Sequence, residues 1–139
     1  MEIIANAVQT VAANQNVYFT DVVACGNCAI THRDDSGLIT LRGITDQCRA
    51  RYRVSFGANI AIPADGTAGP ISLAIAIDGE PAKATTMTVT PTATGAYFNV
   101  YSSLYIDVPK GCCVTVSVKN ISTVDVDVIN ANFIADRTA

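Results

Sequence analysis

Leucine and charged residues are scarce in this sequence of 139 residues. Leucine occurs only 4 times, against 15 valines, 14 isoleucines and 15 threonines, and β-branched side chains favour strands over helices. Charged residues make up 15% of the chain, too few for a disordered segment. The net charge of −3 gives no electrostatic reason to expect nucleic acid or an anionic membrane as a partner. No apolar run reaches 18 residues, so we expect no membrane-spanning helix.

Signals for export and for several domains are missing as well. The opening "MEIIANAVQT" lacks the basic region and apolar stretch of a secretory signal, so we expect a protein made in a cytosol. Structural disulfides are uncommon there, and five cysteines would leave one unpaired. The chain has no fixed-period repeat or low-complexity tract, which predicts one compact domain over residues 1–139.

The hydrophobic pattern that is present has a period of two. In "CRARYRVSFGANIAI" the even positions are apolar and the odd positions polar, as in a sheet packed on one face. The strand 71–79 has small residues opposite its isoleucines, which indicates burial on both faces. In "VDVDVINANFIAD" the alternation flips after Val128, and a bulge near Ile129 or Asn130 would explain the flip.

About ten short strands are expected, with Gly, Pro, Asn and Asp between them, which predicts an all-β antiparallel sandwich or barrel. The expected strands cover residues 7–13, 16–23, 29–32, 38–43, 48–62, 71–79, 84–91, 96–109, 112–121 and 124–136. The expected core residues are Tyr52, Val54, Phe56, Ile60, Leu73, Ile75, Phe98, Val100, Val114 and Val116.

The order of these strands, with "YRVSFGANI", "GPISLAIAIDGEP", "YFNVYSSLYIDVP" and "VPKGCCVTVSVKN", resembles the ten-stranded tumour necrosis factor-like jelly roll that complement globular heads share. The second and fourth phrases are similar to small members from Firmicutes and their phages, which include C-terminal domains of collagen-like spore-surface proteins. The resemblance covers roughly residues 3–136. It implies a homotrimer about a threefold axis, without a catalytic site or a cofactor.

The chain has no Gly-X-Y tract, so by analogy we expect a stand-alone trimer on another structure rather than the tip of a stalk. The resemblance thus predicts a capsid decoration protein of a bacteriophage, made in the host cytoplasm and located on the virion, with itself and the major capsid protein as partners. The alternative is a trimeric fibre tip or lectin-like module that binds a host-surface glycan.

Tyr97, Tyr101 and Tyr105 recur every four residues and therefore share one strand face, opposite Phe98 and Val100. Tyrosine is enriched at interfaces, so we expect these three at the trimer interface. A sugar-binding stripe would look similar, although the chain has no tryptophan.

The cysteines allow two interpretations. "CGNC" has the spacing of half a zinc site, and Cys112 and Cys113 could supply the other half. Neighbouring side chains of a strand point to opposite faces, which favours packing instead. Cys112 would then lie in the core, and Cys113 on the outer or intersubunit face, where we place it in the trimer interface. We expect no metal.

The remaining polar motifs predict surfaces rather than catalysis. His32, the single histidine, lies beside the turn "RDDSG", which indicates a solvated loop. Arg49, Arg51 and Arg53 share one strand face, and we expect them to pair with acids such as Asp125 and Asp127. Exposed loops at one end would attach the trimer to its support, with these candidates: Ile3, Ile4, His32, Arg33 and Asp34.

Overall fold

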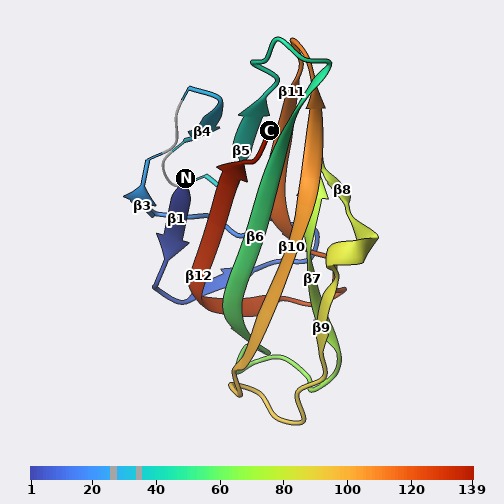
Figure 1. Cartoon of the computed structure of the whole chain (residues 1–139). Coiled ribbons are helices and arrows are strands. Elements are labelled where there is room, and N and C mark those ends of the chain that lie inside the picture. The colour runs from blue at the N-terminus through green and yellow to red at the C-terminus, as the bar shows by residue number, and fades with distance from the viewer. Residues whose placement is uncertain (26–27, 34–35) are drawn as a thin grey trace.

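A computed structural model describes residues 1–25, 28–33 and 36–139. These residues form twelve strands in two antiparallel sheets that pack face to face (Figure 1). The two expected strands 7–13 and 16–23 are shorter than predicted, and two strands, Glu2–Ala5 and Glu80–Pro81, were not predicted. None of the described helices is long and apolar enough to cross a membrane.

Sheet A has the order β10-β6-β12-β1-β3, and β2 pairs with β12 beside β1. Its strands are β1 (Glu2–Ala5), β2 (Gln9–Val11), β3 (Asp21–Ala24), β6 (Arg49–Ala61), β10 (Phe98–Pro109) and β12 (Val126–Arg137). The three longest strands, β6, β10 and β12, are neighbours and run along the length of the molecule (Figure 1).

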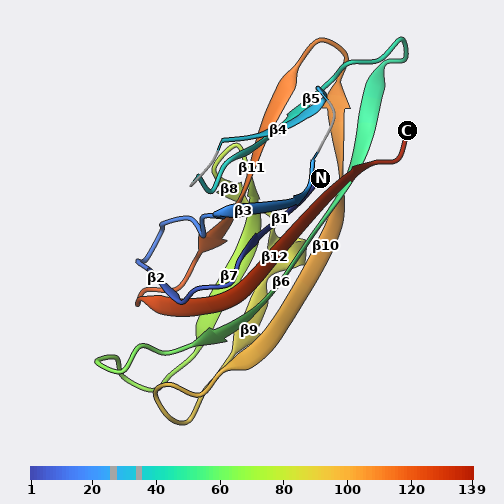
Figure 2. The ribbon, with the colours of Figure 1, turned by 90° about the vertical axis from the view of Figure 1, so that its left-hand side faces the viewer.

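Sheet B has the order β4-β5-β11-β7-β8, and β9 also pairs with β7. Its strands are β4 (Ile30–His32), β5 (Ile39–Arg42), β7 (Ile71–Ile77), β8 (Glu80–Pro81), β9 (Met87–Val89) and β11 (Cys113–Asn120). Figure 2 shows the two sheets as separate layers, with β4, β5 and β11 on one side and β12, β6 and β10 on the other.

The core lies between the sheets and follows the alternation of β6. Its even-numbered residues from Ala50 to Ile60 are buried, whereas its odd-numbered residues up to Asn59 remain at least partly exposed. Three phenylalanines join the layers, because Phe19 stacks edge-on against Phe56 at 6.3 Å between ring centroids and lies 5.8 Å from Phe133. Tyr52 adds a polar link between the sheets.

The hydroxyl group of Tyr52 on β6 donates a hydrogen bond of 2.5 Å to the carbonyl oxygen of Arg42 on β5. Burial raises the pKa of Tyr52, so the hydroxyl stays protonated and able to donate. The expected burial of both faces of the strand 71–79 also holds for its middle, where Ala74 and Ala76 are fully buried.

The predicted bulge in the last strand is confirmed. The register between β12 and β6 shifts between Ile129 and Asn132, and Asn130 adopts a left-handed backbone with φ of 55°. Asparagine tolerates this conformation better than most residues. The extra residue turns Phe133 into the core, directly opposite Phe56.

Most of the expected core residues are buried: Tyr52, Val54, Phe56, Ile60, Leu73, Ile75, Val100 and Val116. Val114 is half-buried and packs against the edge of the core. The prediction for Phe98 is wrong, because its side chain is 43% exposed. Phe98 is the first residue of β10, the edge strand of sheet A, and it has a strand partner, Ile60, on one side only.

Asn120 ends β11 and is a fully buried polar residue whose hydrogen bonds are all made. Its side-chain amide donates to the carbonyl oxygens of Val11 and Val124, each at 2.9 Å, and its side-chain oxygen accepts from the backbone of Ser122 at 2.9 Å. One side chain therefore holds β2 against the turn that leads into β12.

We expect Asn120→Ala to lower the free energy of unfolding by about 2–4 kcal/mol, because it leaves buried backbone groups without partners. Thr123→Ala is the matched control in the same turn, where the side chain is exposed, and should change stability by less than about 0.5 kcal/mol. Equilibrium denaturation in urea measures both. Equal effects of the two substitutions would contradict the structural role of Asn120.

Candidate functional site

The outer face of sheet A carries the most exposed aromatic area of the described chain. Tyr97, Tyr101 and Tyr105 are 43%, 60% and 64% exposed. Tyr101 and Tyr105 lie on the side of β10 that points away from the core, and Tyr97 directly precedes that strand. The outer side chains of β6 and β12 continue the same surface. We call this surface the tyrosine face.

Pairing between strands fixes the centre of the tyrosine face. Tyr101 lies opposite Gly57, and the ring atom Cδ2 is 3.5 Å from the position that a Cβ on Gly57 would take. The ring therefore covers bare backbone. Ile129 and Ile134, both half-buried, continue the surface on β12. An amide hydrogen bond of 3.2 Å from Asn99 to Asn59 adds a neutral polar contact, and Asn132, opposite Gly57, donates a hydrogen bond of 2.6 Å to the carboxylate of Glu2.

One end of the tyrosine face is charged. Asp107 on β10 accepts two hydrogen bonds from the guanidinium group of Arg51, at 2.7 and 3.1 Å, and its second oxygen lies 3.2 Å from Nε of Arg49. The hydrogen bonds from Arg51 lower the pKa of Asp107 and raise that of Arg51. Arg53 lies opposite Tyr105 on one side and Asp136 on the other.

The prediction that these arginines pair with Asp125 and Asp127 is wrong. Asp125 and Asp127 lie at the start of β12 or just before it, while the arginines lie opposite the end of that strand. The strands are antiparallel, so the two sets lie at opposite ends. Asp127 instead accepts a hydrogen bond of 2.6 Å from the hydroxyl group of Thr10.

Cys113 lies apart from the tyrosines. It pairs with Arg42 in sheet B and is exposed on the outer side of that sheet, so it does not belong to the tyrosine face. Cys112 was expected in the core but is also exposed. It ends a tight turn closed by its own N–H and the carbonyl oxygen of Pro109 at 3.0 Å, with Gly111 at φ of 79°, and so it precedes the alternation of β11.

The other cysteines, Cys25, Cys28 and Cys48, are exposed too. Gly26 and Asn27 of the "CGNC" motif lie outside the described residues. Among the residues that the structure describes, no three His, Cys, Asp or Glu side chains are placed to hold a metal ion.

The candidate attachment residues do not form one surface. Ile3 is fully buried between Phe133 and Val22 on the neighbouring strands, so it cannot touch a support. Ile4 is half-buried, Arg33 is exposed, and Asp34 lies outside the described residues.

His32 is not the solvated loop residue that its neighbours suggested. It is half-buried, its ring lies edge-on to Phe19 at 6.3 Å, and Nε2 lies 2.8 Å from the carbonyl oxygen of Ser36. Its other ring nitrogen is buried and has no hydrogen-bond partner among the described residues. Phe19 draws His32 inward across a gap of 13 residues in sequence, which no local pattern could reveal.

Comparisons with known proteins agree with this architecture. The chain is similar to the globular domain of a zebrafish complement 1qA protein, with 14% identity over 96% of this chain and 93% of that one and a TM-score of 0.64. It is also similar to the Eiger tumour necrosis factor from S. frugiperda, with 11% identity over 100% and 92% and a TM-score of 0.67. Murine APRIL gives 10% identity over 93% and 95%, with a TM-score of 0.57.

The fold is the tumour necrosis factor-like jelly roll. Sequence comparisons gave no match, either to a family model or to a curated protein. At identities of 10–14% the likeness concerns the fold of the backbone, and the surface of this jelly roll has to be interpreted from its own residues.

The Asp107 cluster predicts an acid-sensitive contribution to stability. Because the pKa of Asp107 is lowered below its ordinary value of 3.8 in the folded chain, its contribution is complete above that pH and is lost as the pH falls further. The difference in unfolding free energy between the native protein and Asp107→Asn should therefore shrink between about pH 5 and pH 2.

Denaturant unfolding at a series of pH values measures this difference. Asp65→Asn is the control, since Asp65 is exposed and has no hydrogen-bond or ion-pair partner among the described residues. Its curve is the reference against which the pH dependence of Asp107→Asn is compared. Parallel curves for the native protein and Asp107→Asn would contradict the role of the Arg51–Asp107 pair.

Proposed function

We propose that this protein is a homotrimeric structural protein that decorates a bacteriophage head. The observation that carries the trimer is the tyrosine face, where three tyrosines on one edge of sheet A are 43–64% exposed. Large exposed aromatic surfaces are rare on monomers and are typical of interfaces. The tumour necrosis factor-like fold supports packing of this face about a threefold axis.

The composition of the face also supports contact with another copy of the chain. Its centre combines the rings of Tyr101 and Tyr105 with Ile134, while the only ion pairs among the described residues lie at its end, around Asp107. An apolar centre with a charged end is the usual arrangement of a protein interface.

The role on a phage head is supported by the sequence phrases "GPISLAIAIDGEP" and "VPKGCCVTVSVKN". They resemble small structural proteins of Firmicute phages. A decoration protein needs no catalytic group, only a stable shape, a surface that assembles and a surface that attaches. On this proposal the chain is made in the host cytoplasm and ends on the virion surface, bound to the major capsid protein.

The trimer predicts a native mass of three chains. Tyr101→Ala should shift the protein towards monomers and lower its thermal midpoint, because a central interface tyrosine contributes about 2 kcal/mol or more per copy. Native mass spectrometry and analytical ultracentrifugation measure the assembly.

Tyr18→Ala is the matched control, since Tyr18 is 46% exposed but lies in a segment hydrogen-bonded to β11 of sheet B. It should leave the mass unchanged. If Tyr101→Ala also leaves the trimer mass and the thermal midpoint unchanged, the tyrosine face is not the interface. Glycan binding by that face would then be the hypothesis to test, with cell-wall sugars as ligands.

The location on the head predicts that the protein is a virion component. Particles purified from a lysate of the cell that carries the coding sequence should contain the chain in a fixed ratio to the major capsid protein. Purified protein should also co-sediment with heads from which it has been stripped. Its absence from the particles, or its presence only on tail fractions, would contradict this role while leaving the trimer in place.

A further inference from the structure

The charges of this protein are separated along its length. At one end β5 stops at Arg42, β6 starts at Arg49 and β12 stops at Arg137, and the turn between β10 and β11 holds Lys110. Backbone hydrogen bonds from Lys110 to Cys48 and from Gly43 to Cys112 join these segments. We call this end of the molecule, near the C-terminus in Figure 1, the basic end.

Among the described residues, five cations and two carboxylates lie at the basic end, a net side-chain charge of +3 in a chain whose total is −3. The rest of the chain therefore carries −6. The cations are Arg42, Arg49, Arg51, Lys110 and Arg137, and the carboxylates are Asp46 and Asp107.

The opposite end is acidic. Asp65 and Asp125 line one hollow there together with Val124, and Asp127 follows on β12. The sequence has no Lys or Arg between residues 54 and 82, which include the first loop of that end. Such a charge separation orients the molecule towards a charged surface and raises the rate of encounter with it.

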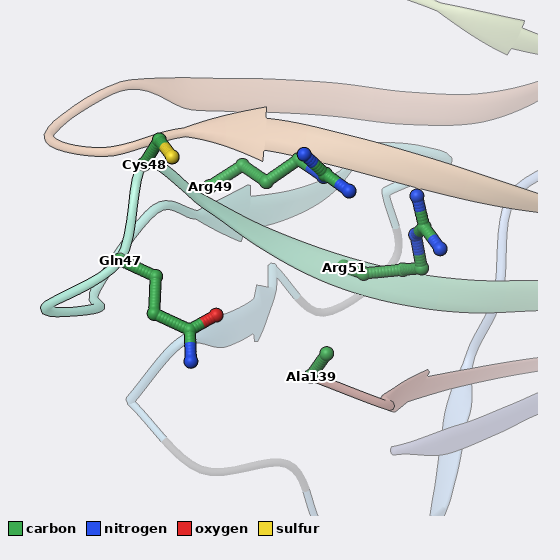
Figure 3. Close-up of a pocket in the computed structure, with 5 residues that line it drawn as sticks. All are labelled: Gln47, Cys48, Arg49, Arg51 and Ala139. Carbon is green, nitrogen blue, oxygen red and sulfur yellow. The ribbon is translucent and has the colours of Figure 1, made fainter.

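The basic end is also hollowed. A cavity of about 140 Å³ is lined by Gln47, Cys48, Arg49, Arg51 and Ala139 (Figure 3). A second, more open hollow shares Gln47 and adds Ile44, Asp46 and Arg137. Figure 3 shows Arg49 and Arg51 projecting from the same strand, with Cys48 where that strand begins.

The arginines keep free donors towards this cavity. Arg51 uses Nε and one terminal nitrogen on Asp107, and Nε of Arg49 lies 3.2 Å from the second oxygen of Asp107. The terminal nitrogens of Arg49 make no hydrogen bond to another described residue. Asp107 neutralises only one of the two guanidinium groups, so the pair keeps a positive charge and the planar fork geometry that binds carboxylates.

We propose that the basic end is a docking site for an acidic polypeptide segment of a partner protein, with a partner carboxylate bound by Arg49 beside Asp107. Arg51, on the same strand, already binds a carboxylate at the basic end, that of Asp107. Ile44, 46% exposed, gives an apolar contact of the kind that a polypeptide offers and an inorganic anion does not. The proposal holds for the protein in any assembly state, and a parallel trimer would place three such sites at one end.

Binding of a fluorescein-labelled oligoglutamate peptide to the full chain tests this site, measured by fluorescence anisotropy at low salt and at physiological salt. Arg49→Gln combined with Arg137→Gln should weaken binding by about tenfold or more, since it removes two positive charges from the basic end and, at Arg49, the proposed hydrogen bond to the carboxylate. Lys83→Gln combined with Lys119→Gln is the matched control, because it removes the same charge away from the basic end and should leave the affinity within about twofold.

A second measurement needs no substitution. Cys48 lines the cavity and is exposed, whereas Cys113 is exposed on the outer side of sheet B. Bound oligoglutamate should slow the alkylation of Cys48 by iodoacetamide more than that of Cys113, as followed by peptide mass spectrometry. This result is independent of whether the arginine variants fold.

Three results would overturn the proposal. The first is absence of binding together with unprotected Cys48. The second is an equal loss of affinity in the two double variants, which would mean attraction by overall charge. The third is competition by inorganic tripolyphosphate at concentrations below those of unlabelled oligoglutamate, which would assign the site to phosphate. The oligomeric state enters none of these results, so they are separate from a failure of the trimer.

Discussion

The strict alternation along β6 is the constraint on which the rest of this structure depends. This strand of 13 residues turns its even-numbered side chains into the core and its odd-numbered side chains outward. Both neighbours, β10 and β12, pair with it, so its register determines which of their residues face the core. The inward side gives the sandwich its aromatic centre around Phe56. The outward side, with Gly57 at its middle and arginines at its end, determines where Tyr101 lies and where Asp107 finds its partners.

The same alternation separates the surfaces that the two proposals use. Tyrosines and isoleucines lie towards the middle of sheet A, where a copy of the chain can cover them, and the cations gather at one end of it. An apolar surface suits a permanent contact because its burial is favourable at any salt concentration, whereas a charged end suits a contact that has to be found and oriented. On the two proposals, assembly and docking use chemically different parts of the molecule.

The alternation of apolar and polar residues in the sequence predicted which side chains of the long strands face the core. The core side of β6, the burial of both faces of β7 and the flip after Val128 all follow from which residues alternate. Pattern failed where contacts come from distant residues or where a strand ends. Phe98 has the phase of a core residue but begins an edge strand, Cys112 lies in a turn just before β11, and His32 is drawn inward by Phe19. The pairing of Arg51 with Asp107 depends on a register between strands 56 residues apart, and sequence alone does not contain that register.

The bulge at Asn130 has a consequence for how the gene can change. It shifts the alternation of β12 by one residue. Even-numbered residues face the core before the bulge, and odd-numbered residues face the core after it. Loss of that one codon would remove the bulge and let the strand alternate without interruption, so that Phe133 still faces the core, whereas pairing of the full-length strand without the bulge would place Phe133 in water and Ile134 in the core. A substitution at Asn130 keeps the number of residues and leaves the alternation of β12 unchanged. The bulge and the extra residue are therefore gained or lost together, while the residue types of this last strand can diverge.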